Sequence, residues 1–156
     1  MGDLMNNNKV AFLFPGQASQ IPGMGLDLYN NSAAAREVFQ EADDILGRKL
    51  SNVIFEGSKE ELTRTENAQP SIATVSIAAW RAIESEMGSI QIPNFTAGHS
   101  LGEYSSLATA GSLSIKDTID LVSKRGELME KACNIAPGGM SAIIGIDATA
   151  VKEVCE

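Results

Sequence analysis

The sequence predicts an α/β fold with a mostly parallel sheet, and three observations carry that prediction. Two short apolar runs, KVAFLF at residues 9–14 and FTAGH at residues 95–99, have the length of buried strands, and each stops at a turn. Segments with helical periodicity separate the two runs. Strands that alternate with helices in this way are typical of parallel sheets in α/β proteins.

The N-terminal half contains one loop and three predicted helices. Residues 15–31 hold five turn-forming prolines and glycines among apolar side chains, which indicates an ordered loop. Helices with clear start or stop signals follow the loop: one from Ser32 to about Leu46, a short one from Ser58, and one from Pro70 to Met87. The last helix is rich in Ala, Ile and Val, so we expect it to be buried on most sides and to end at Gly88.

The C-terminal half also alternates strands and helices. Its predicted elements are a strand at 95–99 that leads into a helix through Ala110, a helix from Ser114 to about Ala132, a strand at 140–146, and a helix from Asp147 that continues at Glu156. A strand and a helix without a third element rarely close a domain. We therefore expect the chain to be a fragment, a truncated product or part of a split protein.

Composition narrows the classes of function. The 156 residues are 44% apolar and carry a formal net charge of −8, which excludes a disordered protein and argues against nucleic-acid binding and attraction to anionic membranes. No apolar run approaches the roughly 20 residues that span a bilayer. Two cysteines, Cys133 and Cys155, form no metal-binding pattern, so we expect no metal site and a reducing, cytoplasmic setting.

The strongest chemical signal is the segment Gly98-His99-Ser100-Leu101-Gly102, which has the pattern G-x-S-x-G. A serine at a tight turn between a strand and a helix has strained backbone geometry, and its hydroxyl projects from the carboxyl end of the sheet. The flanking glycines leave room for the strand and the helix to pack closely. We interpret Ser100 as a nucleophile; the alternative is a turn whose serine only caps the helix.

A second candidate element, Phe14-Pro15-Gly16-Gln17, follows the first predicted strand. Because loops after parallel strands gather at one edge of a sheet, we expect this loop and the turn at Ser100 to face each other. A serine that attacks an ester or thioester needs two N–H donors for the developing oxyanion. We assign these to the amides of Leu101 and Gln17; the alternative for Gln17 is an ordinary turn residue.

Arg125 occupies a position in the helix from Ser114 where the periodicity predicts an apolar side chain. The stripe on that helix repeats every three or four residues: Ile115, Thr118, Val122, Arg125, Met129 and Ala132. A cation on a buried face needs an anionic partner, because an unpaired buried charge is costly. The alternatives are that Arg125 extends to solvent or pairs with an acidic neighbour.

A series of motifs makes one family resemblance specific. FPGQASQIPGMG, TENAQPSI, AGHSLGEYSSL, KRGELMEKA and GGMSAIIG follow one another in order. The series resembles the N-terminal half of the malonyl-CoA:acyl carrier protein transacylase family, whose wider relatives are the acyltransferase domains of fatty acid and polyketide synthases. The resemblance covers about residues 9–156. A patatin-like or other serine hydrolase shares G-x-S-x-G without this series.

The resemblance implies an activity and a role for each matching residue. The activity is transfer of a malonyl group from malonyl-CoA to the phosphopantetheine thiol of acyl carrier protein, for fatty acid or polyketide biosynthesis, without a bound cofactor. Ser100 would be the nucleophile, the amides of Gln17 and Leu101 would bind the oxyanion, and Arg125 would pair with the malonyl carboxylate. Leu101 is similar to the residue at this position in malonyl-using members.

The resemblance also implies a division of the chain. A polar lead at 1–8 would precede an α/β-hydrolase-like large subdomain at 9–137, which is incomplete. Residues 138–156 would be the start of a ferredoxin-like small subdomain. Acyl carrier proteins are acidic as a class, so docking to this acidic chain requires a local basic patch, for which Lys116, Lys124 and Lys131 on one predicted helix are candidates. The alternative is that these lysines form an ordinary solvated helix face.

One feature departs from the family. Its members activate the serine with a histidine from the second half of the domain, whereas the one histidine of this sequence is His99. Adjacent residues at a sharp elbow point in different directions, so we do not expect His99 to act as the base for Ser100. We therefore expect the 156-residue chain alone to be impaired as an enzyme. Three functions stay open: an acyltransferase, a non-catalytic fragment that binds acyl carrier protein or a partner chain, and a serine hydrolase.

Overall fold

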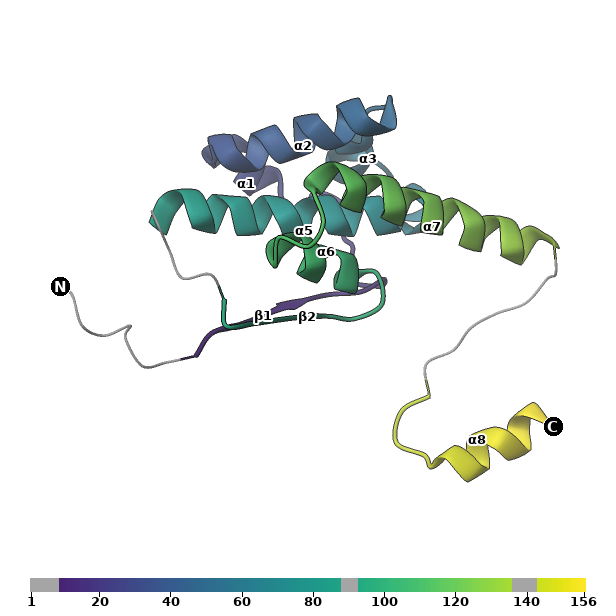
Figure 1. Ribbon diagram of the computed structural model, residues 1–156. Coiled ribbons are helices and arrows are strands. Elements are labelled where there is room, and N and C mark those ends of the chain that lie inside the picture. The colour runs from purple at the N-terminus through teal and green to yellow at the C-terminus, as the bar shows by residue number, and fades with distance from the viewer. Residues whose placement is uncertain (1–8, 88–92, 136–142) are drawn as a thin grey trace.

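The computed structural model describes residues 9–87, 93–135 and 143–156 (Figure 1). Two strands, β1 (Ala11–Phe14) and β2 (Phe95–Gly98), form a parallel pair in which Ala11 lies opposite Phe95 and Phe14 opposite Gly98. The parallel pairing and the helices between the strands confirm the predicted α/β class. The polar lead at 1–8 and the expected helix end at Gly88 lie outside the described residues.

Helices make up most of the described structure. In chain order they are α1 (Leu26–Asn31), α2 (Ala33–Leu46), α3 (Leu50–Glu56), α4 (Lys59–Thr63), α5 (Thr65–Met87), α6 (Gly102–Thr109), α7 (Ile115–Ile135) and α8 (Ala148–Cys155). Figure 1 shows α2, α5 and α7 stacked above the strands, with α6 between this stack and the sheet. None of the described helices is long and apolar enough to span a membrane.

The core lies where α2, α5 and α7 meet. Its largest fully buried apolar side chains come from five segments: Phe39, Leu50, Ile54, Ile77, Leu101, Ile119 and Val122. Three aromatic rings extend it beneath α1, where Tyr29 meets Phe39 and Phe55 edge-on at centroid distances of 5.7 and 5.2 Å. This helical core fixes α5 and α7 against each other, and both helices contribute to the site described below.

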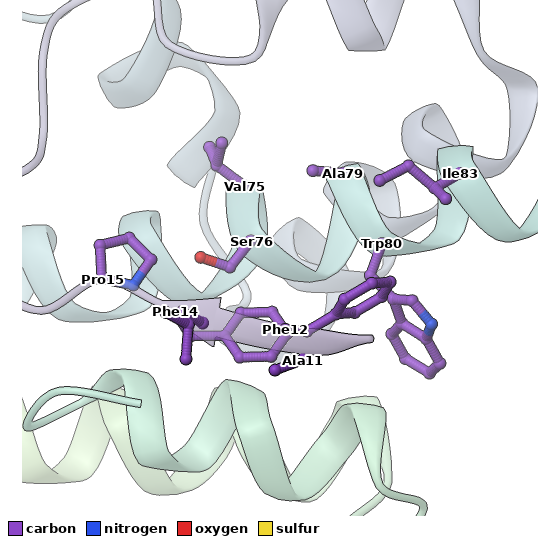
Figure 2. A pocket seen from close by; sticks show the side chains of 10 residues that line it. Ala11, Phe12, Phe14, Pro15, Val75, Ser76, Ala79, Trp80 and Ile83 are labelled. Atoms are coloured by element: carbon purple, nitrogen blue, oxygen red, sulfur yellow. The ribbon is translucent and has the colours of Figure 1, made fainter. Parts of the chain in front are cut away.

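The sheet is covered on one face only in the described part of the chain. Phe14 is buried, whereas Leu13 is 77% exposed and Phe95 on the paired strand is 58% exposed. The expectation of a fully buried strand at 9–14 is therefore wrong, because the described helices pack on one side of the sheet. A hollow of about 400 Å³ separates β1 from α5, and Figure 2 shows Phe12 and Phe14 facing it.

Predicted helix caps agree closely with the structure. The hydroxyls of Ser32 and Ser58 accept hydrogen bonds from the amides of Ala35 and Glu61, and Gly47 ends α2 in the left-handed region with φ 61°. Asp147 caps α8 in the same way through the amides of Thr149 and Ala150. Each cap satisfies backbone groups that a helix end leaves without partners.

Several boundaries differ from the prediction. Residues 15–31 are not a loop throughout, because α1 occupies the end of that segment and packs Leu28 and Tyr29 against the core. Helix α3 was not predicted at all. Residues 143–146 of the strand expected at 140–146 form no strand, and the rest of it lies outside the described residues. A strand needs a neighbour for its backbone groups, and within residues 9–87, 93–135 and 143–156 the strands β1 and β2 pair only with each other.

Helix α5 begins at Thr65, one and a half turns before the predicted start at Pro70. A proline inside a helix leaves the carbonyl four residues earlier without its amide partner. Here that carbonyl belongs to Glu66, and the guanidinium of Arg48 donates to it at 3.4 Å. The extension carries Thr65 and Gln69 into the helix, and both side chains contact residues of the candidate site.

Candidate active site

The segment around Ser100 forms the sharp strand-to-helix turn that its glycines predict. Strand β2 ends at Gly98 and α6 begins at Gly102. A Cβ atom at Gly98 would overlap the backbone of Gly102, so only glycine permits this close approach. Ser100 itself has φ 56°, in the left-handed region that is strained for any residue other than glycine.

The hydroxyl of Ser100 does not cap α6. The residue at the cap position is Leu101, and no side chain accepts a hydrogen bond from the first amides of the helix. Instead the Oγ atom of the exposed Ser100 accepts a hydrogen bond from Nη2 of Arg125 at 3.0 Å. The serine therefore presents its hydroxyl to a cation and to solvent, at the positive end of a helix.

The loop after β1 lies against this turn, as the parallel register requires. The amide of His99 donates to the carbonyl of Phe14 at 3.0 Å. A Cβ at Gly102 would overlap the Phe14 carbonyl and lie 2.6 Å from that of Pro15, and one at Gly16 would lie 2.8 Å from the His99 carbonyl. Backbone thus packs on backbone between the two loops, which brings the segment that carries Gln17 beside Ser100.

The two amides assigned to the oxyanion remain without an acceptor in the described part of the chain. Neither the N–H of Gln17 nor that of Leu101 donates a hydrogen bond there. The side chain of Gln17 points to Thr65, with its Nε2 atom 2.7 Å from the threonine hydroxyl. The following residue, Ala18, has φ 83°, so both facing loops contain a strained non-glycine residue.

Arg125 projects from α7 toward Ser100 and is half-buried. Its Nη2 atom donates to Ser100 Oγ, and its Nη1 atom donates to the amide oxygen of Gln69 on α5. No carboxylate of the described residues pairs with this guanidinium. Arg125 therefore does not pair with an acidic neighbour among these residues. Its two hydrogen-bond partners, Gln69 and Ser100, are neutral, so its positive charge lies beside the serine hydroxyl.

His99 occupies the elbow without contacting the serine hydroxyl. Its ring lies over Gly16, where an added Cβ would overlap Nδ1. In the part of the chain that the structure describes, no hydrogen bond joins this ring to Ser100. The side chains of His99 and Ser100 therefore diverge at the sharp turn, as predicted.

Two site neighbours were missed from the residues alone. Gln69 is fully buried, and Thr65 receives the Gln17 side chain. Both lie in the segment TENAQPSI, which the family resemblance singled out without giving it a role. The sequence signal for Gln69 is a side-chain amide directly before Pro70, at a position outside the predicted helix.

The surroundings of Arg125 are apolar and open. A hollow of about 470 Å³ runs along α7 beside it, lined mainly by Tyr104, Leu121, Leu128 and Met129.

Among the candidate docking lysines, Lys116 donates to Asp120 at 2.8 Å, and this carboxylate raises the pKa of Lys116. Lys124 similarly pairs with Glu127 at 3.5 Å. Two of the three lysine charges are therefore balanced by acids on their own helix.

Comparisons with known proteins agree with this geometry. A sequence model of the acyl transferase domain matches residues 11–155. The malonyl CoA-acyl carrier protein transacylase of Bacillus subtilis strain 168 is 54% identical over 149 residues, which cover 96% of this chain and 46% of that protein. The chain spans about half the length of the curated relatives it matches.

Solved structures share the fold. The acyl-carrier-protein S-malonyltransferase of Bartonella henselae is 43% identical with a TM-score of 0.81, over 95% of this chain and 48% of that one. A malonyl-transacylase in complex with its type II polyketide acyl carrier protein is 40% identical, also with a TM-score of 0.81, over 95% and 47% of the two chains. These similarities confirm the predicted α/β fold.

Proposed function

The chain belongs to the acyl transferase domain family, and on that premise we propose that it carries the acyl-accepting site of a malonyl-CoA:acyl carrier protein transacylase. The observation that supports this most directly is the hydrogen bond between Arg125 and Ser100. It joins a strained, exposed serine to a cation that has no acidic partner among the described residues. A nucleophile and a carboxylate-binding group at this separation suit an acyl group that ends in a carboxylate.

In the proposed first step, Oγ of Ser100 attacks the thioester carbonyl of malonyl-CoA. The new C–O bond forms as the C–S bond breaks, and the hydroxyl proton leaves with the coenzyme A thiol through a base. The products are a malonyl ester on Ser100 and free coenzyme A. In the second step the phosphopantetheine thiol of acyl carrier protein attacks the ester, and the serine hydroxyl is restored.

The negative charge that develops on the carbonyl oxygen requires donors that are already in place. We assign these to the amides of Leu101 and Gln17, which donate to no acceptor within the described residues. The turn at Ser100 and the loop after β1 hold the two amides, and the tight backbone contact between the loops limits their movement. Fixed donors of this kind cost no reorganisation when the oxyanion forms.

Arg125 supplies the charge that selects the substrate. A guanidinium presents a flat set of donors that matches a carboxylate. Its Nη1 atom is held by Gln69, so Nη2 can exchange the Ser100 hydroxyl for the malonyl carboxylate. A hydrolase for uncharged esters would have no use for this cation, which supports the transferase over the serine hydrolase.

The similarity to a malonyl-transacylase of known structure and the state of the cysteines support the remaining assignments. We propose malonyl-CoA and acyl carrier protein as partners, residues 9–137 as part of the large subdomain, 138–156 as the start of the small one, and a cytoplasmic setting. A relative of known structure is bound to an acyl carrier protein, and both cysteines here are free and exposed. The base for Ser100 is not among the groups that contact its hydroxyl in the described residues.

The proposal is tested by mapping the site of acylation. The purified protein is incubated with malonyl-CoA and with imidazole, which supplies a proton acceptor, and is then digested and analysed by mass spectrometry for peptides that gain one malonyl group. We expect the group on Ser100, no adduct in Ser100→Ala, and an unchanged adduct in Ser112→Ala, which removes an exposed serine outside the site. A malonyl group on another residue, or none at all, contradicts the proposal.

A further inference from the structure

The side chain of Gln69 is fully buried on α5, which is unusual for a polar group without a structural role. Its amide oxygen accepts a hydrogen bond from Nη1 of Arg125, and its amide nitrogen donates to the sulfur of Met129 at 3.1 Å. A thioether is a weak acceptor, whereas the bond to the guanidinium is charge-assisted. The contact with Arg125 is therefore the stronger reason for the orientation of this amide.

The backbone brings these two residues within reach of each other. Gly126 follows Arg125 on α7, and a Cβ there would lie 2.7 Å from the carbonyl of Thr65. The helices α5 and α7 therefore approach at backbone contact, one turn from Gln69. This close approach allows a side chain of glutamine length to hold the guanidinium at Nη1 while Nη2 donates to Ser100.

We propose that Gln69 is a positioning residue that aims Arg125 at the acyl group while leaving its positive charge available. This inference rests on the proposed function. An acceptor is needed because a half-buried guanidinium with free donors would rotate among several orientations. A neutral acceptor is needed because a carboxylate of the same shape would form an ion pair with Arg125 and compete with the malonyl carboxylate for it.

Two substitutions separate these requirements. Gln69→Leu removes the acceptor and retains most of the volume, so it frees the guanidinium. Gln69→Glu keeps the shape and the hydrogen bond, so the guanidinium stays fixed but loses its free charge. Thr74→Val is the matched control, because it removes a buried hydroxyl on the same helix that donates to the carbonyl of Pro70 at 2.8 Å and forms no hydrogen bond with Arg125 in the described residues.

The first measurement is the rotation rate of the guanidinium, observed by NMR of its side-chain nitrogens. In the 156-residue protein with Gln69→Leu, we expect Arg125 to rotate about 10- to 100-fold faster than in the wild type, the scale for a lost hydrogen bond to a charged group. Arg36 is the internal reference, because its two bonds to the carbonyls of Tyr29 and Asn30 are remote from the site. Unchanged rotation at Arg125 overturns the proposal.

The second measurement is the ratio of malonyl to acetyl adducts on Ser100 when both thioesters compete in one tube. We expect the ratio to fall about tenfold or more in both Gln69 variants and to stay at the wild-type value in Thr74→Val. Because Gln69→Glu preserves the shape of the side chain, it tests the charge requirement even where Gln69→Leu unfolds.

The outcomes distinguish the two proposals. A wild-type ratio retained in Gln69→Glu overturns the role of Gln69 and leaves the proposed function intact. A wild-type protein that takes up no malonyl group, or takes up both groups equally, overturns the proposed function and with it the selective role of Arg125. Rotation that changes only in Gln69→Leu, together with a lowered ratio in both variants, supports the inference.

Discussion

The Nη2 atom of Arg125 lies 3.0 Å from Oγ of Ser100, although 25 residues separate the two in the chain. The two residues are placed in different ways. Ser100 is fixed by the turn between β2 and α6, and Arg125 by the packing of α7 on α5. The candidate site is therefore assembled from the core outward, and changes in that packing should alter it in predictable ways.

The elbow at Ser100 stores backbone strain, which predicts that Ser100→Gly stabilises the protein. Glycine adopts the observed φ of 56° without a steric penalty. We expect the free energy of unfolding to rise by about 1 kcal/mol, the lower end of the cost of such a residue. Urea denaturation measures this change, and Ser100→Ala, which keeps the strain, is the control. Equal stability of the two variants would mean that the turn is relaxed.

The contact between the two site loops predicts that Gly102→Ala is strongly destabilising. Its new methyl group would meet the carbonyls of Phe14 and Pro15. Backbone cannot yield as a flexible side chain can, so we expect a loss of about 1–3 kcal/mol in unfolding free energy. Glu103→Ala, an exposed change in the next residue, should stay within about 0.5 kcal/mol of the wild type. Thermal and urea unfolding decide between these values.

Some of this arrangement could be read from the sequence, and the reason differs from element to element. Ser32, Ser58 and Asp147 act through neighbours within three residues, so their caps were predictable. The Ser100 turn was predictable because its flanking glycines permit the close approach of strand and helix that other residues would block. Arg125 stood out because a cation interrupted an apolar stripe.

Other features depend on contacts that no local pattern encodes. Helix α5 starts before Pro70, and Arg48, 18 residues before Glu66, donates to the carbonyl that the proline leaves without its amide partner. The role of Gln69 depends on the approach of α7, which follows from Gly126 only once the two helices are known to be neighbours. Helix α1 was not predicted because the glycines and prolines before it indicate a loop.

The position of His99 predicts that it does not serve Ser100 as a base. Its ring lies over Gly16, so His99→Ala should leave the rate of malonyl labelling within about twofold of the wild type, below the usual range for general bases. Added imidazole should raise the labelling rate of the 156-residue chain, because it supplies the proton acceptor that the described residues do not place at Ser100. Quenched time courses analysed by mass spectrometry give both rates. A large loss in His99→Ala would restore this histidine as the base.

The cap of α8 predicts a pH dependence in the acid range. Hydrogen bonds from the amides of Ala150 and Thr149 lower the pKa of Asp147 from its ordinary value of 3.8. A carboxylate whose pKa is lowered by folding contributes stability that is present above the ordinary pKa and is lost as the pH falls through the lowered one. The helical 13C shifts of residues 148–150 should therefore decline on acidification. In Asp147→Asn, whose amide caps without titrating, they should be independent of pH.

The most direct test of the account is the competition between malonyl-CoA and acetyl-CoA for Ser100 in the wild type and in Arg125→Ala. If Arg125 binds the malonyl carboxylate, the variant should lose roughly 2–5 kcal/mol of preference for malonyl transfer, the scale for breaking a buried charge pair, while its uptake of acetyl groups stays equal or increases. Peptide mapping of both adducts in one sample gives the preference. Equal losses of malonyl and acetyl uptake would show that Arg125 maintains the structure and does not select the acyl group.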